Sequence, residues 1–409
     1  MSLPPHLEAL RDEALRISCD RWAIQKRWKL SKGIDRAGPC PVCGGTDRFS
    51  IHTKKNTFNC RRCGISGGGV IDLVIKTENV DFTRACEIVT GRKASDPVDE
   101  KRMAEMRARN EADERRRAED VERYREKARK RAYEIWRSGL SPSWWPASLE
   151  SAVAAYLRQR GIRLGMGEHE TVRGDMIALR EDRLPWKEKQ GSTWVTLAEG
   201  PVMLAAVQRP DGTFGAVHQT WLDPAQPKGK LVLPLDPEGN ERPSKKVLGV
   251  KKGGAIRLYT PDACRRADAG VVETRIRPLR LVMGEGIETT LTPLAHNFEP
   301  DTAYWAGVDL GNMAGKAARS ESGGQVYDQP DMQDSDCFVP PDWCEELVFL
   351  AEGDSPENHA EEKIIRGLRR ALRYRQLRCE INPELPPLAA SYVPAPGDGM
   401  DLNDLVRVE

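Results

Sequence analysis

Two pairs of closely spaced cysteines constrain this chain more than any other feature of its sequence. Cys40 and Cys43 enclose Pro-Val, Cys60 and Cys63 enclose Arg-Arg, and 16 residues separate the two pairs. Each pair can turn two thiolates toward one ion, and two pairs complete the tetrahedral set that structural zinc prefers. The residues between the pairs read as a β-hairpin. The sequence therefore predicts a zinc ribbon in which Cys40, Cys43, Cys60 and Cys63 hold one structural zinc ion.

The rest of the composition indicates the cellular compartment in which this ribbon would fold. Ten cysteines in 409 residues are too few for a disulfide scaffold. The other six show no metal-ligand spacing, and burial is the simpler interpretation for them. The N-terminus has no basic flank followed by an apolar stretch, and no run of about 18 apolar residues occurs. We expect no secretory signal, no membrane partner and a reducing cytoplasm.

Charge distribution, rather than net charge, points to nucleic acid. The whole chain has 63 Lys and Arg against 62 Asp and Glu, yet residues 21–63 hold eleven basic residues and two acidic ones. Aromatic residues are interleaved there, namely Trp22, Trp28, Phe49 and Phe58. Cations for phosphates and aromatic faces for bases are typical of single-strand binding. The alternative is a generic basic surface with buried aromatic residues. The candidate contacts in the ribbon are Arg48, Lys54, Lys55, Arg61 and Arg62.

The chain divides into four segments by composition. Residues 1–94 form the zinc-ribbon domain with a basic N-terminal arm. Residues 95–138 are dense in Ala, Glu and Arg with few apolar residues, which favours a charged, solvated linker helix. Residues 139–275 and 276–409 alternate strand-like and helix-like pieces, as in an α/β body. A hairpin is expected around Asp211-Gly212.

Several carboxylates in the last segment directly follow apolar strands. Glu285 ends LRLVMGE, and Glu352 and Asp354 follow ELVFLA. Asp401 and Asp404 lie near the C-terminus. Carboxylates at the carboxyl ends of strands in an α/β sheet converge where such folds bind ligands, and clustered oxygens bind Mg²⁺ or Mn²⁺. The alternative is that they are ordinary surface acids.

The motifs GEGIETTLT (284–292), AEGDSP (351–356) and GMDLNDLV (399–406) resemble the TOPRIM fold. Preceded by a zinc ribbon, they give the chain an order similar to that of DnaG-type DNA primases of phages and mobile elements. The resemblance implies a multi-domain α/β protein with an N-terminal zinc ribbon, a charged linker helix and a C-terminal primase core. Residues 139–275 would form the first part of that core, and 276–409 its Rossmann-like TOPRIM domain.

The resemblance also implies an active site. Glu285 matches the catalytic glutamate of the family, and Glu352 and Asp354 match its D-x-D pair, although the first acid here is Glu rather than Asp. With Asp401 they would hold catalytic Mg²⁺ or Mn²⁺. Lys230, Lys245 and Lys246, in the segment before TOPRIM, are candidates for template or nucleotide phosphates. A solvated basic loop is the alternative for these lysines.

The function implied is synthesis of RNA primers from ribonucleoside triphosphates on a single-stranded DNA template, in a bacterial host cell. No G-x-x-x-x-G-K-[ST] motif occurs, so unwinding would need a separate replicative helicase. Two alternatives remain open. One is a zinc-ribbon DNA-binding replication or regulatory protein with a degenerate TOPRIM domain. The other is a TOPRIM nuclease or recombination factor.

Overall fold

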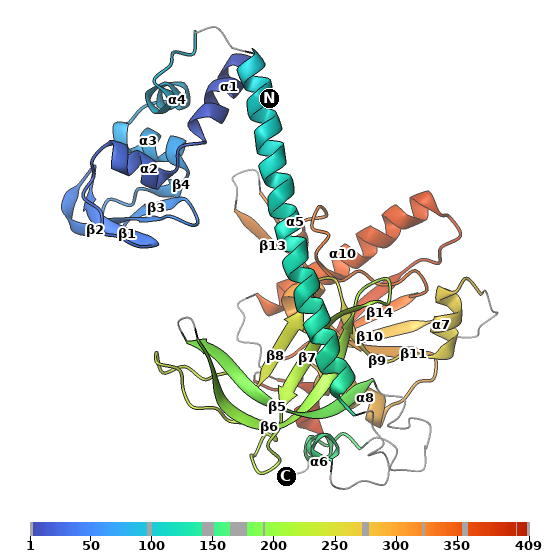
Figure 1. Ribbon diagram of the computed structural model, residues 1–409. Helices are drawn as coiled ribbons and strands as arrows, with labels where there is room; N and C mark the ends of the chain where they lie inside the picture. The colour runs from blue at the N-terminus through green and yellow to red at the C-terminus, as the bar shows by residue number, and fades with distance from the viewer. Residues whose placement is uncertain are drawn as a thin grey trace. The chain divides into compact units, whose positions relative to one another are not determined.

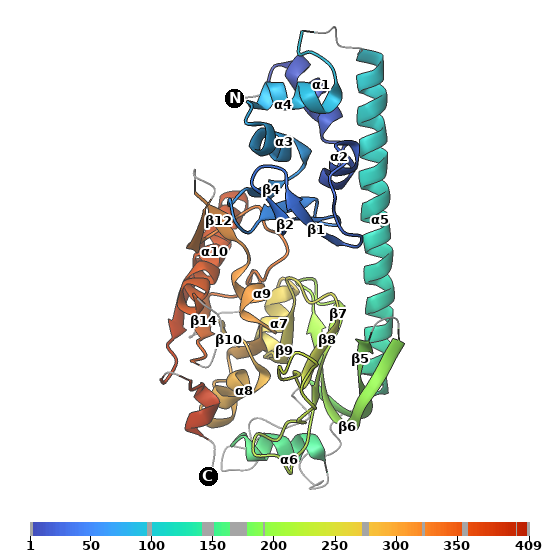
Figure 2. The same cartoon turned by 90° about the vertical axis from the view of Figure 1, so that its left-hand side faces the viewer.

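The computed structural model describes residues 3–95, 100–140, 151–163, 178–190, 193–271, 278–320, 324–353, 359–397 and 399–406. The chain forms two compact units, Met1–Glu119 and Asp120–Glu409. The boundary between them falls inside the long helix α5 (Glu100–Ser138), seen in Figures 1 and 2. The protein is therefore of the mixed α/β class, with an N-terminal zinc-ribbon-like β region.

The smaller unit is built on a four-stranded antiparallel sheet with the strand order β1-β2-β3-β4. The strands are β1 (Asp35–Cys40), β2 (Gly44–His52), β3 (Thr57–Cys60) and β4 (Ser66–Gly68). The helices are α1 (Pro5–Ala14), α2 (Cys19–Gln25), α3 (Val70–Glu78) and α4 (Phe82–Thr90). Asn56 adopts φ +52° in the turn from β2 to β3, where the sequence predicts the hairpin turn.

The core of this unit contains most of the aromatic residues of the basic segment. Trp22, Phe49 and Phe58 are 5%, 0% and 3% exposed and pack with the apolar face of α3. Trp28 is half-buried, with its ring edge-on to Phe49 at 5.7 Å between centroids. The expectation that these rings face bases is therefore wrong for Trp22, Phe49 and Phe58. A sheet of four short strands has few other large side chains with which to build a core.

Helix α5 begins in the first unit and ends in the second. Its Ala-, Glu- and Arg-rich sequence has high helix propensity and little apolar surface. Near its C-terminal end, however, Ala132 is fully buried, and the Tyr133 ring lies 5.2 Å from that of Phe214. Trp136 packs on the same core and carries the Arg180 guanidinium 4.5 Å from its ring centre. These turns are thus part of the second unit, in contrast to a fully solvated linker.

The larger unit contains a nine-stranded mixed sheet with the order β15-β14-β10-β11-β9-β6-β7-β8, and β5 pairs with β6. Strand β10 pairs in parallel with β11 and β14, and β14 pairs in parallel with β15. The other neighbours are antiparallel. The strands are β5 (Leu179–Gln190), β6 (Thr193–Gln208), β7 (Phe214–Trp221), β8 (Lys245–Gly249), β9 (Ala255–Tyr259), β10 (Arg280–Gly284), β11 (Thr302–Ala306), β14 (Glu346–Leu350) and β15 (Ala389–Val393).

The expected hairpin at Asp211-Gly212 joins β6 to β7, with Gly212 at φ +77°. The smaller elements of this unit are α6 (Ala152–Gln159), α7 (Asp262–Asp268), α8 (Ile287–His296), α9 (Leu310–Ala314), α10 (Ala360–Ile381), the hairpin β12 (Ala317–Arg319) with β13 (Gln325–Pro330), and the 3₁₀ helix η2 (Leu402–Leu405). No helix among the described residues is long and apolar enough to span a membrane.

Successive residues of the buried strands alternate between two cores, as the period of two requires. On β11, Tyr304 and Ala306 pack with α6 and α8, whereas Ala303 and Trp305 pack with α10. The parallel strands are apolar on both sides because helices cover both faces. This arrangement leaves the carboxyl ends of β10 and β14 as the place where polar residues can gather.

Candidate functional site

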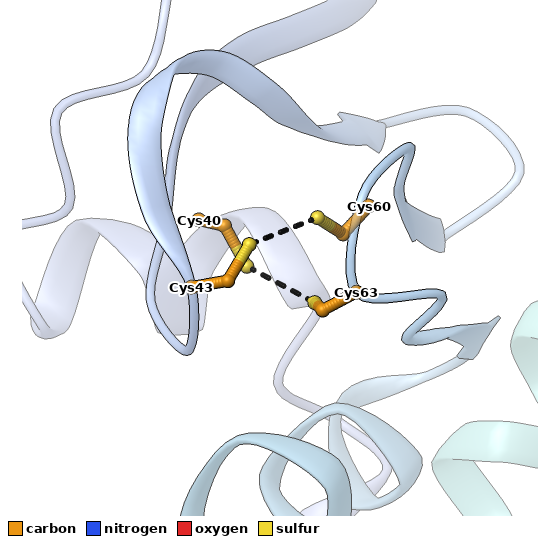
Figure 3. A group of neighbouring side chains, drawn as sticks. All are labelled: Cys40, Cys43, Cys60 and Cys63. Atoms are coloured by element: carbon orange, nitrogen blue, oxygen red, sulfur yellow. Dashed lines mark hydrogen bonds between the residues drawn. The ribbon is translucent and has the colours of Figure 1, made fainter.

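The four predicted zinc ligands come together at one end of the small sheet. Cys40 ends β1 and Cys60 ends β3, and each is followed by a tight turn that brings back Cys43 or Cys63. The four Sγ atoms lie within 4.8 Å of one another, with 3.7 Å between Cys40 and Cys63 and 3.6 Å between Cys43 and Cys60. Figure 3 shows the side chains pointing toward a common centre. Four converging sulfur ligands fit a tetrahedral structural zinc site.

The backbone beside the cysteines explains why the turns can be so tight. Gly44 has φ +66° and Gly64 has φ +76°. Residues with a side chain rarely adopt this backbone conformation. Each glycine directly follows the second cysteine of its pair, so it lets the chain reverse without displacing the sulfur. Among the described residues, this is the one group of three or more His, Cys, Asp or Glu side chains placed to hold a metal ion.

The predicted DNA contacts of the ribbon lie at two ends of β3. Lys54 and Lys55 are exposed in the turn before β3, whereas Arg61 and Arg62 are exposed in the zinc turn after it. Arg61 donates to the Asp47 carbonyl at 2.7 Å. Arg48 is half-buried, and its side chain lies over Gly45. The structure thus leaves four of these five cations exposed to solvent, in the two turns on either side of β3.

Two of the predicted catalytic carboxylates lie at neighbouring strand ends. Gly284 of β10 pairs in register with Leu350 of β14, so Glu285 and the Ala351-Glu352 pair leave the sheet side by side. Glu352 Oε1 accepts hydrogen bonds from the Gly286 amide at 3.0 Å and from Thr289 Oγ1 at 2.6 Å. These donors fix the Glu352 carboxylate against the first turn of α8.

The other two predicted acids do not extend this pair within the described structure. Asp354 lies outside the described residues. Asp401 caps η2 by accepting from the Asp404 amide at 2.9 Å, and its other oxygen is 3.7 Å from the Arg160 guanidinium. Asp401 therefore has a local structural role, whatever else it does.

A buried polar cluster that the sequence analysis missed lies beside these acids. Glu288, in the first turn of α8, is 7% exposed at its side chain and forms an ion pair with Lys230 at 2.9 Å. Glu288 Oε1 also accepts from the hydroxyl of Tyr156, which is fully buried on α6. The sequence contains one sign of this cluster, which is a single charged residue in the helical segment IETTLTPL. Its partners lie too far along the chain to be paired by spacing.

The charges and hydrogen bonds around Glu288 keep its carboxylate in the ionised form. Burial alone would raise the pKa of Glu288, but the charges of Lys230 and Lys245 and the Tyr156 hydrogen bond place it well below its usual value. Burial, together with the Glu288 charge, raises the pKa of Tyr156. His218, which is also buried, has its pKa lowered to about 4, mainly by burial and also by Lys245. The cluster therefore holds an anionic carboxylate and a neutral imidazole at neutral pH.

The three lysines singled out from the sequence have three different surroundings. Lys230 contacts Glu288, as described above. Lys245 is exposed on β8. Lys246 lies with its ammonium 3.3 Å from the centre of the Trp186 ring and donates to the Lys187 carbonyl. The charges of Lys230 and Lys245 both act on Glu288, whereas Lys246 lies on the Trp186 ring.

Two known protein families match the chain, one in the ribbon and one in part of the larger unit. Residues 35–70 match the family described as the zinc-binding domain of primase-helicase. Residues 126–258 match a family described as a domain of unknown function, DUF7146. No curated protein matches the chain.

Two solved structures show distant similarity. The primase of Aquifex aeolicus, in its zinc-binding and RNA polymerase domains, aligns over 99% of this chain and 82% of that chain, at 12% identity and a TM-score of 0.32. The primase fragment of the bacteriophage T7 primase-helicase aligns over 92% and 93%, at 10% identity and a TM-score of 0.25. Scores this low establish no shared overall fold. The protein is therefore placed among those that carry a primase-like zinc ribbon, on the match to residues 35–70.

Proposed function

We propose that the chain is a DNA primase of the phage or mobile-element type, whose α/β sheet is a TOPRIM domain. The observation that carries the proposal is the combination of a primase-type zinc ribbon with two carboxylates at the ends of adjacent parallel strands. The ribbon would recognise the template, and carboxylates at the carboxyl ends of parallel strands would hold the metal ions used in nucleotidyl transfer. The substrates would be single-stranded DNA and ribonucleoside triphosphates, with a separate helicase as partner.

In this proposal each acid has a stated task. Glu285 leaves β10 at a Gly-rich turn and would accept the proton of the attacking 3′-hydroxyl or act as a metal ligand. Glu352, held by Gly286 and Thr289, would present its second oxygen as a ligand, together with Asp354. Asp401 would have to leave its cap on η2 to join them as a further ligand. Bound Mg²⁺ or Mn²⁺ would supply positive charge that activates the attacking oxygen and stabilises the leaving one. Exposed ribbon cations and Lys245 would contact phosphates.

A second candidate function is a zinc-ribbon DNA-binding protein whose α/β site is degenerate. The specific observation in its favour is that Glu352 Oε1 already accepts two internal hydrogen bonds and Asp401 caps η2. Carboxylates used in this way stabilise the local fold without any catalysis. Both candidates bind single-stranded DNA, so binding alone does not distinguish them.

Incorporation of labelled ribonucleotides on unprimed single-stranded DNA, with Mg²⁺ and Mn²⁺ tested separately, distinguishes the candidates. Two substitutions at Glu352 sharpen the test. Glu352→Gln keeps an oxygen that can accept from Gly286 and Thr289 but removes the charge, whereas Glu352→Asp keeps the charge on a shorter side chain. A primase should lose activity with Gln and retain more of it with Asp. Absence of incorporation by the wild type with either metal, on varied templates, would favour the binding protein.

A further inference from the structure

The buried rings of the ribbon raise the question of where a base could stack on this protein. Stacking needs an aromatic face that solvent can reach. Of the tryptophans within the described residues, Trp194 is the most exposed, with 63% of its surface accessible, whereas the others are buried or half-buried. Trp194 lies near the start of β6, in the outer part of the β5–β6 hairpin. A single exposed apolar side chain is common on protein surfaces, so the groups around Trp194 decide whether it marks a binding site.

The neighbours of Trp194 across the hairpin are cationic. Trp194 is the direct cross-strand partner of Lys189, and two residues further along each strand Lys187 pairs with Thr196. Cross-strand partners project to the same face, so Lys187, Lys189 and Trp194 share one face of the hairpin. Both lysines are exposed. This face therefore combines an open indole ring with two ammonium groups.

The acidic residues of the same hairpin are largely neutralised by other partners. Glu188 forms a two-armed ion pair with Arg242, with both distances at 2.7 Å, and Glu199 lies 3.6 Å from Arg183. The positive charge beside Trp194 is thus not cancelled by these two carboxylates. An acidic partner is favoured over a basic or neutral one.

A groove of about 760 Å³ lies next to this face, within the second unit. Its lining includes Trp194, Lys187, Lys246 and Arg131, with Glu134 as the one carboxylate. Trp221 and Leu248 contribute apolar surface to the same lining. A groove with both apolar surface and three cations suits a strand whose bases and phosphates alternate along its length.

We propose that the outer β5–β6 hairpin and this groove bind single-stranded nucleic acid, with Trp194 stacking on a base and Lys187 and Lys189 contacting phosphates. The inference rests on the proposed function, because it names the place where the larger unit holds its template. It supplies an exposed ring for base stacking, whereas Trp22, Phe49 and Phe58 of the ribbon are buried. Neither the cysteine motif nor the candidate catalytic acids lie on this hairpin.

The test measures binding of a ~20-nucleotide labelled oligothymidylate by the full-length protein at several salt concentrations, since single-strand sites span several nucleotides. Trp194→Ala should weaken binding about tenfold without changing its salt dependence, and Trp194→Phe should retain most of the affinity. The pair Lys187→Gln/Lys189→Gln should reduce the slope of log affinity against log salt by about 1.4, or 0.7 per lost phosphate contact. Tyr124→Ala, which removes an exposed ring from α5, is the matched control and should bind as the wild type does.

Two results would overturn the inference. One is no binding by the wild type. The other is binding by Trp194→Ala within about twofold of the wild type, when its thermal unfolding and zinc content are unchanged. If Trp194→Ala then also alters self-association in sedimentation, the groove would be assigned to a second copy of the chain. Ribonucleotide incorporation is scored separately, so Trp194-dependent binding without incorporation would support this site while counting against a primase.

Discussion

At the scale of single residues, the most informative group is the buried carboxylate of Glu288. A carboxylate removed from water is stable as an anion only when nearby cations and donors replace its hydration. Lys230 at 2.9 Å and the Tyr156 hydroxyl do so here. The three residues come from α8, from the segment after β7 and from α6, so the ion pair and the hydrogen bond join parts of the second unit that are distant in sequence.

Glu288→Gln should destabilise the second unit by about 3–5 kcal/mol, because it leaves the Lys230 charge buried without its partner. The double variant Glu288→Gln/Lys230→Met removes both charges and leaves an oxygen that can accept from Tyr156. It should recover most of the loss in the free energy of unfolding measured with denaturant. Equal destabilisation in the single and double variants would show that charge pairing is not what holds the cluster.

His218 should make the stability of the second unit depend on pH. Its pKa in the folded chain is about 4, against 6.5 ordinarily, because burial and Lys245 oppose protonation and outweigh Glu288. The unfolded chain therefore binds a proton that the folded chain does not, and stability falls as pH decreases from 6.5 toward 4. One such group contributes at most about 1.4 kcal/mol per pH unit. The thermal midpoint of His218→Gln should fall less steeply over this range than that of the wild type.

At the scale of elements, the zinc turns and the strand–turn–helix units are the parts that sequence predicts best. Both are local, since cysteine spacing defines the ribbon and an apolar strand followed by a Gly-rich turn defines β10 with α8. The Glu288–Tyr156 contact could not be predicted, because its partners are 132 residues apart and belong to different elements. The aromatic residues of the ribbon were misassigned for a related reason. Local sequence shows a ring beside cations but not whether the small sheet needs that ring for its core.

Cys60→Ser should remove zinc from the purified protein and unfold the ribbon, since three sulfur ligands leave the tetrahedral site incomplete. Metal analysis of the wild type should give one zinc per chain. Cys379→Ser is the matched control, because Cys379 is half-buried and its thiol donates only to the Leu385 carbonyl. Zinc content that stays at the wild-type level in Cys60→Ser, with the ribbon folded, would contradict the assignment.

At the scale of the whole molecule, two compact units share one helix, and each carries a different functional part of the proposed enzyme. The first unit carries the ribbon that matches primase-helicase zinc domains, and the second carries the sheet with Glu285 and Glu352. Because the two features lie in different units, an experiment can change one and leave the other unchanged. A substitution at the sheet edge should affect the proposed catalysis while leaving zinc binding and the proposed DNA contacts of the ribbon in place.

The most direct test of this account is primer synthesis by Glu285→Gln compared with the wild type. Glutamine is nearly isosteric with glutamate, so folding, zinc content and single-stranded DNA binding should be unchanged. It lacks the charge that would take a proton or hold a metal, and ribonucleotide incorporation should fall by about 10²-fold or more. Incorporation by Glu285→Gln at the wild-type rate would contradict the assignment of the active site to the ends of β10 and β14.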